Sequence, residues 1–203
     1  MKNYIVINDQ QIDLTEEQVK KITAAAGIAG TKLSEIGVGD EFKLGAHEFV
    51  VLQQSEDTAA VILKDLLPDT TTFGKIDNKY DGSNVDLACC DFAVELFSIV
   101  GSENVVPHTV DLTSDDGLKD YGQVERAVSL LTTDEYRRYV EILDKHKPDE
   151  WWWLATPHST ATHGNDKWAK CVSPSGRIYY YSYYYDFGVR PFCILKSNIF
   201  VSR

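Results

Sequence analysis

The spacing of apolar residues changes several times along this chain, which predicts short strands interleaved with helices. Short runs rich in β-branched and aromatic residues, separated by Gly, Asn, Asp and Ser, are typical of strands. We expect strands at residues 3–7, 10–14, 41–44, 48–53, 59–63, 151–154, 177–185 and 192–195, and around Val172. Apolar positions at helical spacing predict helices after Thr15, at 85–100 and from Thr132 to about His146. This order of elements predicts an α+β fold.

Start and stop residues support the helices. Thr15 with Gln18, and Thr132 with Glu135, have the spacing of a capping box. Gly27 and Gly101 follow helical segments, where glycine commonly ends a helix. We expect a polar loop at Pro68–Asn84.

The chain divides at a segment rich in glycine and alanine, Gly27–Lys32. Before it, residues 1–26 have the pattern of a small ββα appendage. After it, we expect the main domain to begin near Leu33 and to run to residue 203.

Composition and charge narrow the class of protein. The chain has 203 residues with 43% hydrophobic and 25% charged side chains, which is typical of a globular protein. Its net charge of −11 argues against nucleic acid as a partner, because phosphates require clustered cations. No apolar run approaches the ~20 residues of a membrane span, and the N-terminus lacks a secretory signal. We therefore expect a cytoplasmic or virion-associated protein.

The charge and the aromatic residues are unevenly distributed. Residues 1–150 carry 29 acidic and 14 basic side chains, whereas residues 151–203 carry 2 acidic and 6 basic ones. The same tail holds 13 of the 23 aromatic residues, including six tyrosines within Tyr179–Tyr185. Tyrosine gives a large contact area at low entropic cost, so binding loops use it often.

The sequence contains no convincing metal site. Asp77–Gly82 faintly resembles a calcium loop, but Ala88 stands where a bidentate glutamate is required. His158 and His163 lie near Cys171 at spacings that zinc sites do not use. We expect neither a metal nor a cofactor.

The four cysteines lack the spacing of a disulfide framework, which indicates reduced thiols. Cys89 and Cys90 fall within a predicted helix, one facing the core and the other at its edge. Cys171 and Cys193 flank the tyrosine segment, and no activating partner is evident by spacing for a catalytic cysteine.

Residues 178–185 form the most distinctive segment. In an extended chain its side chains alternate between two faces, so about half of the tyrosines are expected to point away from the core. The alternative is an aromatic-rich strand inside a hydrophobic sheet. Exposed aromatic residues clustered on one element would mark a binding surface.

Three further segments occur in a familiar order: Trp151–Pro157, Cys171–Gly176 and Gly188–Phe192. This order resembles the C-terminal part of proteins with a C-type lectin fold of the formylglycine-generating-enzyme type. More narrowly, it resembles the variable proteins of diversity-generating retroelements, which occur in phages and bacteria. The resemblance covers roughly residues 151–203.

In that family a fixed framework encloses a segment that a reverse transcriptase rewrites at adenines, and asparagine codons are typical targets. Such codons can become Tyr, Ser, His, Asp or Gly, but not Trp, Lys or Glu. The tyrosines with Ser182 and Asp186 fit this output, whereas Lys167 and Trp168 do not. The resemblance implies a variable region at about 158–186.

The resemblance also implies which residues hold the fold. Trp151–Trp153, Val172, Val189 and Phe192 would form the core, and Arg190 would be a buried or half-buried anchor for carbonyl groups or a carboxylate. The calcium and sugar motifs of true C-type lectins are absent, so calcium-dependent sugar binding is not implied. Oxidase activity is not implied either, because Cys171 and Cys193 do not reproduce a catalytic pair.

These observations favour a non-enzymatic binding protein whose partner is a protein or glycan on another cell or phage host. One alternative is a formylglycine-generating-type or other thiol enzyme using Cys171 or Cys193, and another is a phage assembly protein. The oligomeric state and the ligand's identity stay open. The candidate ligand-binding residues are His158, His163, Asn165, Asp166, Lys167, Trp168, Tyr179, Tyr181, Tyr183, Tyr184, Tyr185 and Asp186.

Overall fold

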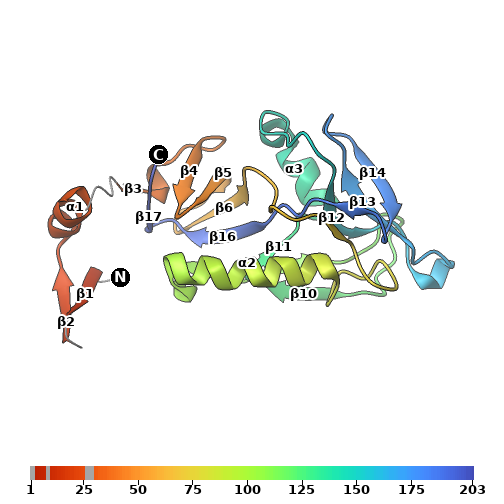
Figure 1. Ribbon diagram of the computed structural model, residues 1–203, viewed down its shortest axis with the longest axis horizontal. Coiled ribbons are helices and arrows are strands. Elements are labelled where there is room, and N and C mark those ends of the chain that lie inside the picture. Colours follow the sequence, from red (N-terminus) through yellow and green to blue (C-terminus); the bar gives the residue numbers. More distant parts are fainter. Residues whose placement is uncertain (1–2, 8–9, 26–29) are drawn as a thin grey trace.

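The computed structural model describes residues 3–7, 10–25 and 30–203 of the chain. Its described part is α+β and is built mostly of small antiparallel sheets (Figure 1). The helices are α1 (Glu16–Ala25), α2 (Asn84–Val100) and α3 (Thr133–Leu143), with short 3₁₀ turns η1 (Leu33–Glu35), η2 (Ser102–Asn104) and η3 (Ala161–His163). The strands are β1 (Asn3–Ile7), β2 (Gln10–Leu14), β3 (Thr31–Lys32), β4 (Glu41–Leu44), β5 (His47–Gln54), β6 (Thr58–Leu63), β7 (Thr71–Thr72), β8 (Val105–Val106), β9 (His108–Asp111), β10 (Gln123–Arg126), β11 (Val128–Ser129), β12 (Trp152–Pro157), β13 (Trp168–Val172), β14 (Ile178–Ser182), β15 (Asp186–Phe187), β16 (Phe192–Lys196) and β17 (Phe200–Val201).

The largest sheet has the strand order β11-β16-β6-β5-β4, with β8 also paired to β16. Strands β4, β5 and β6 form the predicted meander. The register of β16 on β6 places Cys193 opposite Val61. Strand β16, from near the C-terminus, therefore lies inside the sheet, between β6 on one side and β11, which precedes α3, on the other.

Both faces of this sheet are buried, and each face carries its own apolar core. Phe49 and Val51 of β5 face one core with Leu96 of α2. The alternate residues Val50 and Leu52 face the other, which includes residues of α3. Figure 1 shows the two helices on opposite sides of the sheet. This explains why β5 and β6 read as almost continuous apolar runs.

A second sheet, β12-β13-β14, holds the start of the tyrosine segment. Successive tryptophans of β12 face opposite ways: Trp153 joins the α2 core and Trp152 joins the α3 core. Trp151, which precedes the strand, is only half-buried. Two of the three predicted core tryptophans are thus confirmed as fully buried.

Helix α2 ends at Gly101, as predicted, at a φ of 81°. It begins with a cap that was not predicted, in which the Ser83 hydroxyl accepts from the Asp86 amide. Thr132 and Glu135 form the predicted capping box of α3. That helix ends at Leu143, earlier than the predicted His146, because the amides of Lys145 and His146 bond three residues back instead of four.

The N-terminal strands and helix occur where they were predicted. The Thr15 hydroxyl accepts from the Gln18 amide at 3.2 Å, as the capping spacing indicates. Gly27 lies outside the described residues. The predicted linker is wrong at its end, because Thr31 and Lys32 form β3 and pair with β17. The division into an appendage and a main domain stays a prediction.

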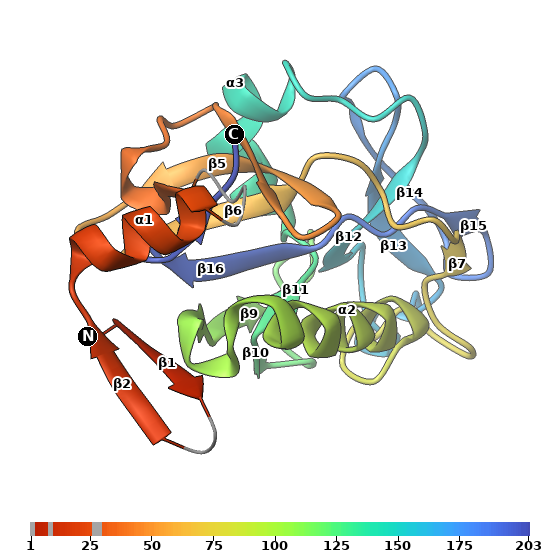
Figure 2. The same ribbon diagram turned by 60° about the vertical axis from the view of Figure 1, so that its left-hand side comes forward.

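The segment predicted as a polar loop, Pro68–Asn84, contributes to the core. Phe73 and Tyr80 are fully buried, and the Tyr80 hydroxyl accepts from the Leu130 amide. Strand β7 of this segment pairs with β15, and the two lie side by side in Figure 2. Isolated apolar residues in an irregular segment have no period, so the pattern could not predict their burial.

Candidate functional site

The tyrosine segment is a strand followed by a tight turn. Strand β14 covers Ile178–Ser182, and the Tyr185 amide donates to the Ser182 carbonyl at 3.1 Å to close the turn. The predicted strand over 177–185 is therefore wrong beyond Ser182. The turn allows Tyr184 and Tyr185 to project together.

Four of the six tyrosines are exposed to solvent. The exposed fractions are 42% for Tyr179, 49% for Tyr180, 61% for Tyr184 and 44% for Tyr185. Tyr181 and Tyr183, which were predicted to face outward, are half-buried against the α2 core. Tyr180 was not among the candidates and is one of the most exposed. We call Tyr179, Tyr180, Tyr184 and Tyr185 the tyrosine surface.

On one face of β14 the aromatic rings form a continuous cluster. Trp151 contacts Tyr179 and Tyr181 edge-on, at centroid distances of 5.3 and 5.2 Å. Phe187 stacks on Trp151 at 5.6 Å, and Tyr185 lies over Phe187 at 6.2 Å. Exposed rings in this group are thus supported by half-buried ones beneath them.

On the other face, Tyr180 forms a separate group. Its ring is parallel to that of His158, with centroids 4.1 Å apart. Trp168 meets it edge-on, and Lys170 Nζ is 5.7 Å from the ring. Lys170 also pairs with Asp115 at 2.9 Å. The single patch that we expected is therefore two aromatic groups on opposite faces of one strand.

The loop from His158 to Lys167 is held in place by hydrogen bonds to two carboxylates that the sequence did not single out. Asp116 accepts from the Ser114 and Ser159 hydroxyls and lies 2.9 Å from His163 Nδ1. These hydrogen bonds, with the Ser114 hydroxyl first, lower the pKa of Asp116 far below its usual range. Asp120 accepts from the buried Thr160 hydroxyl.

Asn78 ties the same loop to the segment before α2. This fully buried amide donates to the carbonyls of Ser159 and Trp168 at 2.8 and 2.7 Å and accepts from the Tyr121 hydroxyl at 2.9 Å. The backbone N–H of Asn78 donates to the Asp166 carbonyl. In sequence, Asn78 is one polar residue among many in a loop, so its role could not be found there.

The remaining candidates contribute through their backbones. The Asn165 amide donates to the Thr160 carbonyl, and the Lys167 carbonyl accepts from Tyr183 at 2.9 Å. Asp186 pairs with Thr72 across the β15–β7 ladder. These contacts fix the path of the segment, and they leave the side chains of Lys167 and Asp186 exposed.

Arg190 anchors the far end of the segment inside the protein. Its guanidinium is completely buried and donates to the carbonyls of Leu63, Lys64 and His146 at 2.8–2.9 Å. It also lies 5.3 Å from the Trp152 ring. Burial lowers the pKa of Arg190 to about 10. The expected anchoring to carbonyl groups is confirmed.

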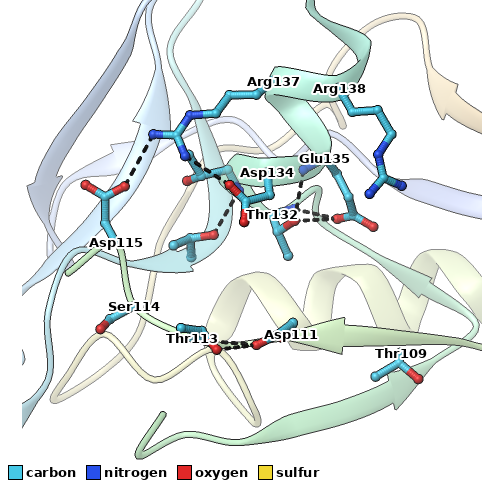
Figure 3. A pocket seen from close by; sticks show the side chains of 12 residues that line it. Thr109, Asp111, Thr113, Ser114, Asp115, Thr132, Asp134, Glu135, Arg137 and Arg138 are labelled. Carbon is cyan, nitrogen blue, oxygen red and sulfur yellow. Dashed lines mark hydrogen bonds and ion pairs between the residues drawn. The ribbon is translucent and has the colours of Figure 1, made fainter. Parts of the chain in front are cut away.

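A polar cavity of about 520 Å³ opens between the N-terminus of α3 and the segment after β9 (Figure 3). Its walls carry four carboxylates, two guanidiniums and several hydroxyls. Arg137 spans it by pairing with Asp134 at 2.9 Å and Asp115 at 3.7 Å (Figure 3). The lining residues are Thr109, Asp111, Thr113, Ser114, Asp115, Thr132, Thr133, Asp134, Glu135, Arg137, Arg138 and Thr156. The ion pairs of Arg137 with Asp134 and Asp115 neutralise part of the charge on the cavity walls.

All four cysteines are free thiols with a raised pKa. Cys171 and Cys193 are buried in different sheets, and desolvation raises the pKa of Cys171 to about 12. Catalytic thiols have a lowered pKa, so these environments are the opposite of activating. Cys89 is buried, as predicted for one of the pair, whereas Cys90 is exposed and not at the edge of the core.

Among the residues that the structure describes, no group of three or more His, Cys, Asp or Glu side chains could hold a metal ion. In the same part of the chain, no helix has the length and apolar character needed to cross a membrane. Comparisons of this chain with protein families, with curated proteins and with solved structures gave no match. The resemblance to variable proteins of diversity-generating retroelements therefore stays a prediction.

Proposed function

We propose that this protein is a non-enzymatic binding protein that presents the tyrosine surface to a protein or glycan on another cell or phage host. The observation that carries the proposal is the exposure of four tyrosines on a segment fixed at both ends. Large rings held in place lose little entropy on binding, and tyrosine is enriched among the residues that dominate binding energy.

We further propose that the scaffold is a C-type lectin fold of the formylglycine-generating-enzyme type and that residues 158–186 are its variable region. In support, the exposed side chains fall within this segment, whereas Val189, Arg190 and Phe192 after it are buried. A protein whose binding residues change must keep its core out of the changing segment. Within the segment, Tyr181 and Tyr183 pack on the core, and Ser159, Thr160, Ser182 and residues 169–173 are buried, so on this proposal these positions stay fixed.

A thiol enzyme is the less supported alternative. Its candidate nucleophiles, Cys171 and Cys193, are buried and have a raised pKa. An assembly protein is the third possibility, and the exposed rings would then form a subunit contact. The mass of the protein in solution distinguishes an assembly from a monomeric binder.

The test is a double variant, Tyr184→Ser with Tyr185→Ser. The labelled protein is applied to a glycan array and to intact bacterial cells of several species. We expect the native protein to bind at least one of these probes and the variant to lose that binding. Because both side chains are exposed, stability should change by only about 0.5 kcal/mol.

The matched control is Leu87→Ser with Val94→Ser, which removes two exposed apolar side chains from α2. This control should bind as the native protein does. Equal binding by both double variants would contradict the proposal. The variable region has its own test, a near-copy of the coding segment for 158–186 that differs at adenines and lies beside a reverse transcriptase gene.

A further inference from the structure

Strand β14 has one edge that no described strand pairs with. It is the last strand of the sheet β12-β13-β14, and β13 is its partner. The Ser173 amide donates to the Arg177 carbonyl and the Tyr183 amide to the Lys167 carbonyl, both at 2.9 Å. These bonds fix the phase of the antiparallel ladder, that is, which residues of β14 direct their backbone N–H and C=O groups toward β13.

In such a ladder, every second residue bonds to the neighbouring strand. The phase therefore directs the backbone groups of Tyr179 and Tyr181 toward β13. The N–H and C=O groups of Ile178 and Tyr180 point the other way. Within the described residues, neither of these two has a backbone hydrogen bond beyond the sheet.

A groove of about 580 Å³ lies between the beginning of β14 and α3. Ile178 and Tyr179 both line it, although they belong to opposite faces of the strand, so the groove lies at the strand's edge. Val140 of α3 is exposed and forms its apolar wall. The lining residues are Tyr136, Arg137, Val140, Gly176, Arg177, Ile178 and Tyr179.

The charge of this groove is opposite to that of the whole protein. Two arginines and no carboxylates line it, on a chain of net charge −11. Arg177 is exposed and has no ion pair among the described residues. Arg137 is paired with Asp134 at 2.9 Å and with Asp115 at 3.7 Å, so among the described residues the uncompensated positive charge of the groove comes from Arg177.

We propose that this edge binds an extended acidic segment of a partner protein, which adds to the sheet as a strand beside β14. Backbone groups of the segment pair with those of Ile178 and Tyr180, as in other cases of strand addition. Side chains of an added strand alternate between the faces. Acidic residues on one face meet Arg177, and apolar residues on the other meet Val140 and Ile178.

The charge also decides against a second copy of this chain as the occupant. A second copy would carry the same net charge of −11, and a net charge far from zero keeps copies of a protein apart. The inference goes beyond the proposed function, because it concerns the backbone edge of β14 and does not use Tyr184 or Tyr185.

The probe is a fluorescein-labelled eight-residue peptide of alternating Glu and Val, titrated against the full chain and followed by fluorescence anisotropy. A Lys and Val peptide tests the charge. The Glu and Val peptide with alternate backbone nitrogens methylated tests the hydrogen bonds. We expect the Glu and Val peptide to bind saturably, and more weakly as the salt concentration rises. We expect neither of the other two peptides to bind.

Tyr180→Pro removes the outward N–H of β14 and leaves the bonds of Tyr179 and Tyr181 to β13. Tyr180→Val removes the ring and keeps the N–H. We expect the proline variant to bind at least about tenfold more weakly than the valine variant, because the two differ in the outward N–H. Arg177→Glu should also weaken binding about tenfold, whereas the matched control Lys75→Glu, at an exposed site elsewhere, should not.

The Arg177 variant and the methylated peptide keep the test valid if the proline variant does not fold. Failure of the native protein to bind the Glu and Val peptide would overturn the proposal, as would equal binding of the methylated peptide. A native dimer that Tyr180→Pro or Arg177→Glu converts to a monomer would also overturn it, because a second copy would then occupy the edge.

Discussion

At the scale of single residues, Arg190 shows how a charge can be used as a structural tie. Removing a guanidinium from water is costly unless its donors are satisfied. Here three carbonyls and the Trp152 ring replace the water. The carbonyls belong to the end of β6 and to the turn after α3, so one side chain fixes the C-terminal segment to two elements.

Replacing this side chain should therefore destabilise the fold. We expect Arg190→Met to lower the free energy of unfolding by about 2–4 kcal/mol, because charge-assisted hydrogen bonds are lost and carbonyls are left buried. Arg190→Lys should recover part of this. Urea unfolding measures the effect, with the exposed Arg177→Met as control. A change under about 0.5 kcal/mol for Arg190→Met would contradict this role.

His108 gives the fold a pH dependence with a defined sign. Burial lowers its pKa to about 4, below the ~6.5 of the unfolded chain. Between these values the unfolded chain binds the proton more strongly, so stability falls as pH falls through this range and is fully present above it. The ring packs on Phe192 and lies 2.8 Å from the Ser129 hydroxyl.

We expect His108→Gln to remove this component. Between pH 7 and pH 4, the native protein should lose up to about 3 kcal/mol more of its unfolding free energy than the variant does. Unfolding by urea at a series of pH values measures the difference. Parallel pH curves for the two proteins would show that His108 does not titrate in this way.

At the scale of elements, the short pair β3–β17 joins the residues that follow Gly30 to the C-terminal segment. Thr31 pairs with Val201, and the following amides of Leu33 and Ser34 donate to the carbonyls of Ile199 and Ser197. Leu33 is fully buried. The first residues after the predicted linker therefore belong to the same packed unit as the C-terminus.

A chain beginning at Gly30 should fold with an unchanged melting temperature, because it keeps β3 and Leu33. A chain beginning at Ile36 should melt at a distinctly lower temperature, because β17 loses its partner and the core loses Leu33. Calorimetry of the two shortened chains measures this. A large loss in the first chain would show that residues 1–29 stabilise the rest.

At the scale of the whole molecule, the last quarter of the chain supplies both framework and surface. It provides β16 in the middle of the largest sheet, all of the β12-β13-β14 sheet and the whole tyrosine surface. On the proposed function, the positions able to vary are those whose side chains do not pack against the apolar cores. Tyr180 and Tyr184 meet this condition, whereas Tyr181 does not.

Local features of the fold could be predicted from sequence because their causes lie within a few residues. The capping boxes of α1 and α3 and the β4–β6 meander depend on spacings of two to four residues, and each is present. The exposure of several tyrosines also followed, since a strand presents alternate side chains to each face. The α+β class follows from the order of such elements.

The sequence by itself determined the helices, most strands, the capping boxes of α1 and α3 and the concentration of tyrosines, and the resemblance implied the anchoring role of Arg190. Only the tertiary structure decided which tyrosines are exposed, because this depends on Trp151 and Phe187 covering one face of β14. It also decided the role of Asn78, the burial of Phe73 and Tyr80, the pairing of β3 with β17 and the free edge of β14. Each of these joins residues far apart in the chain, and no local spacing records such a contact.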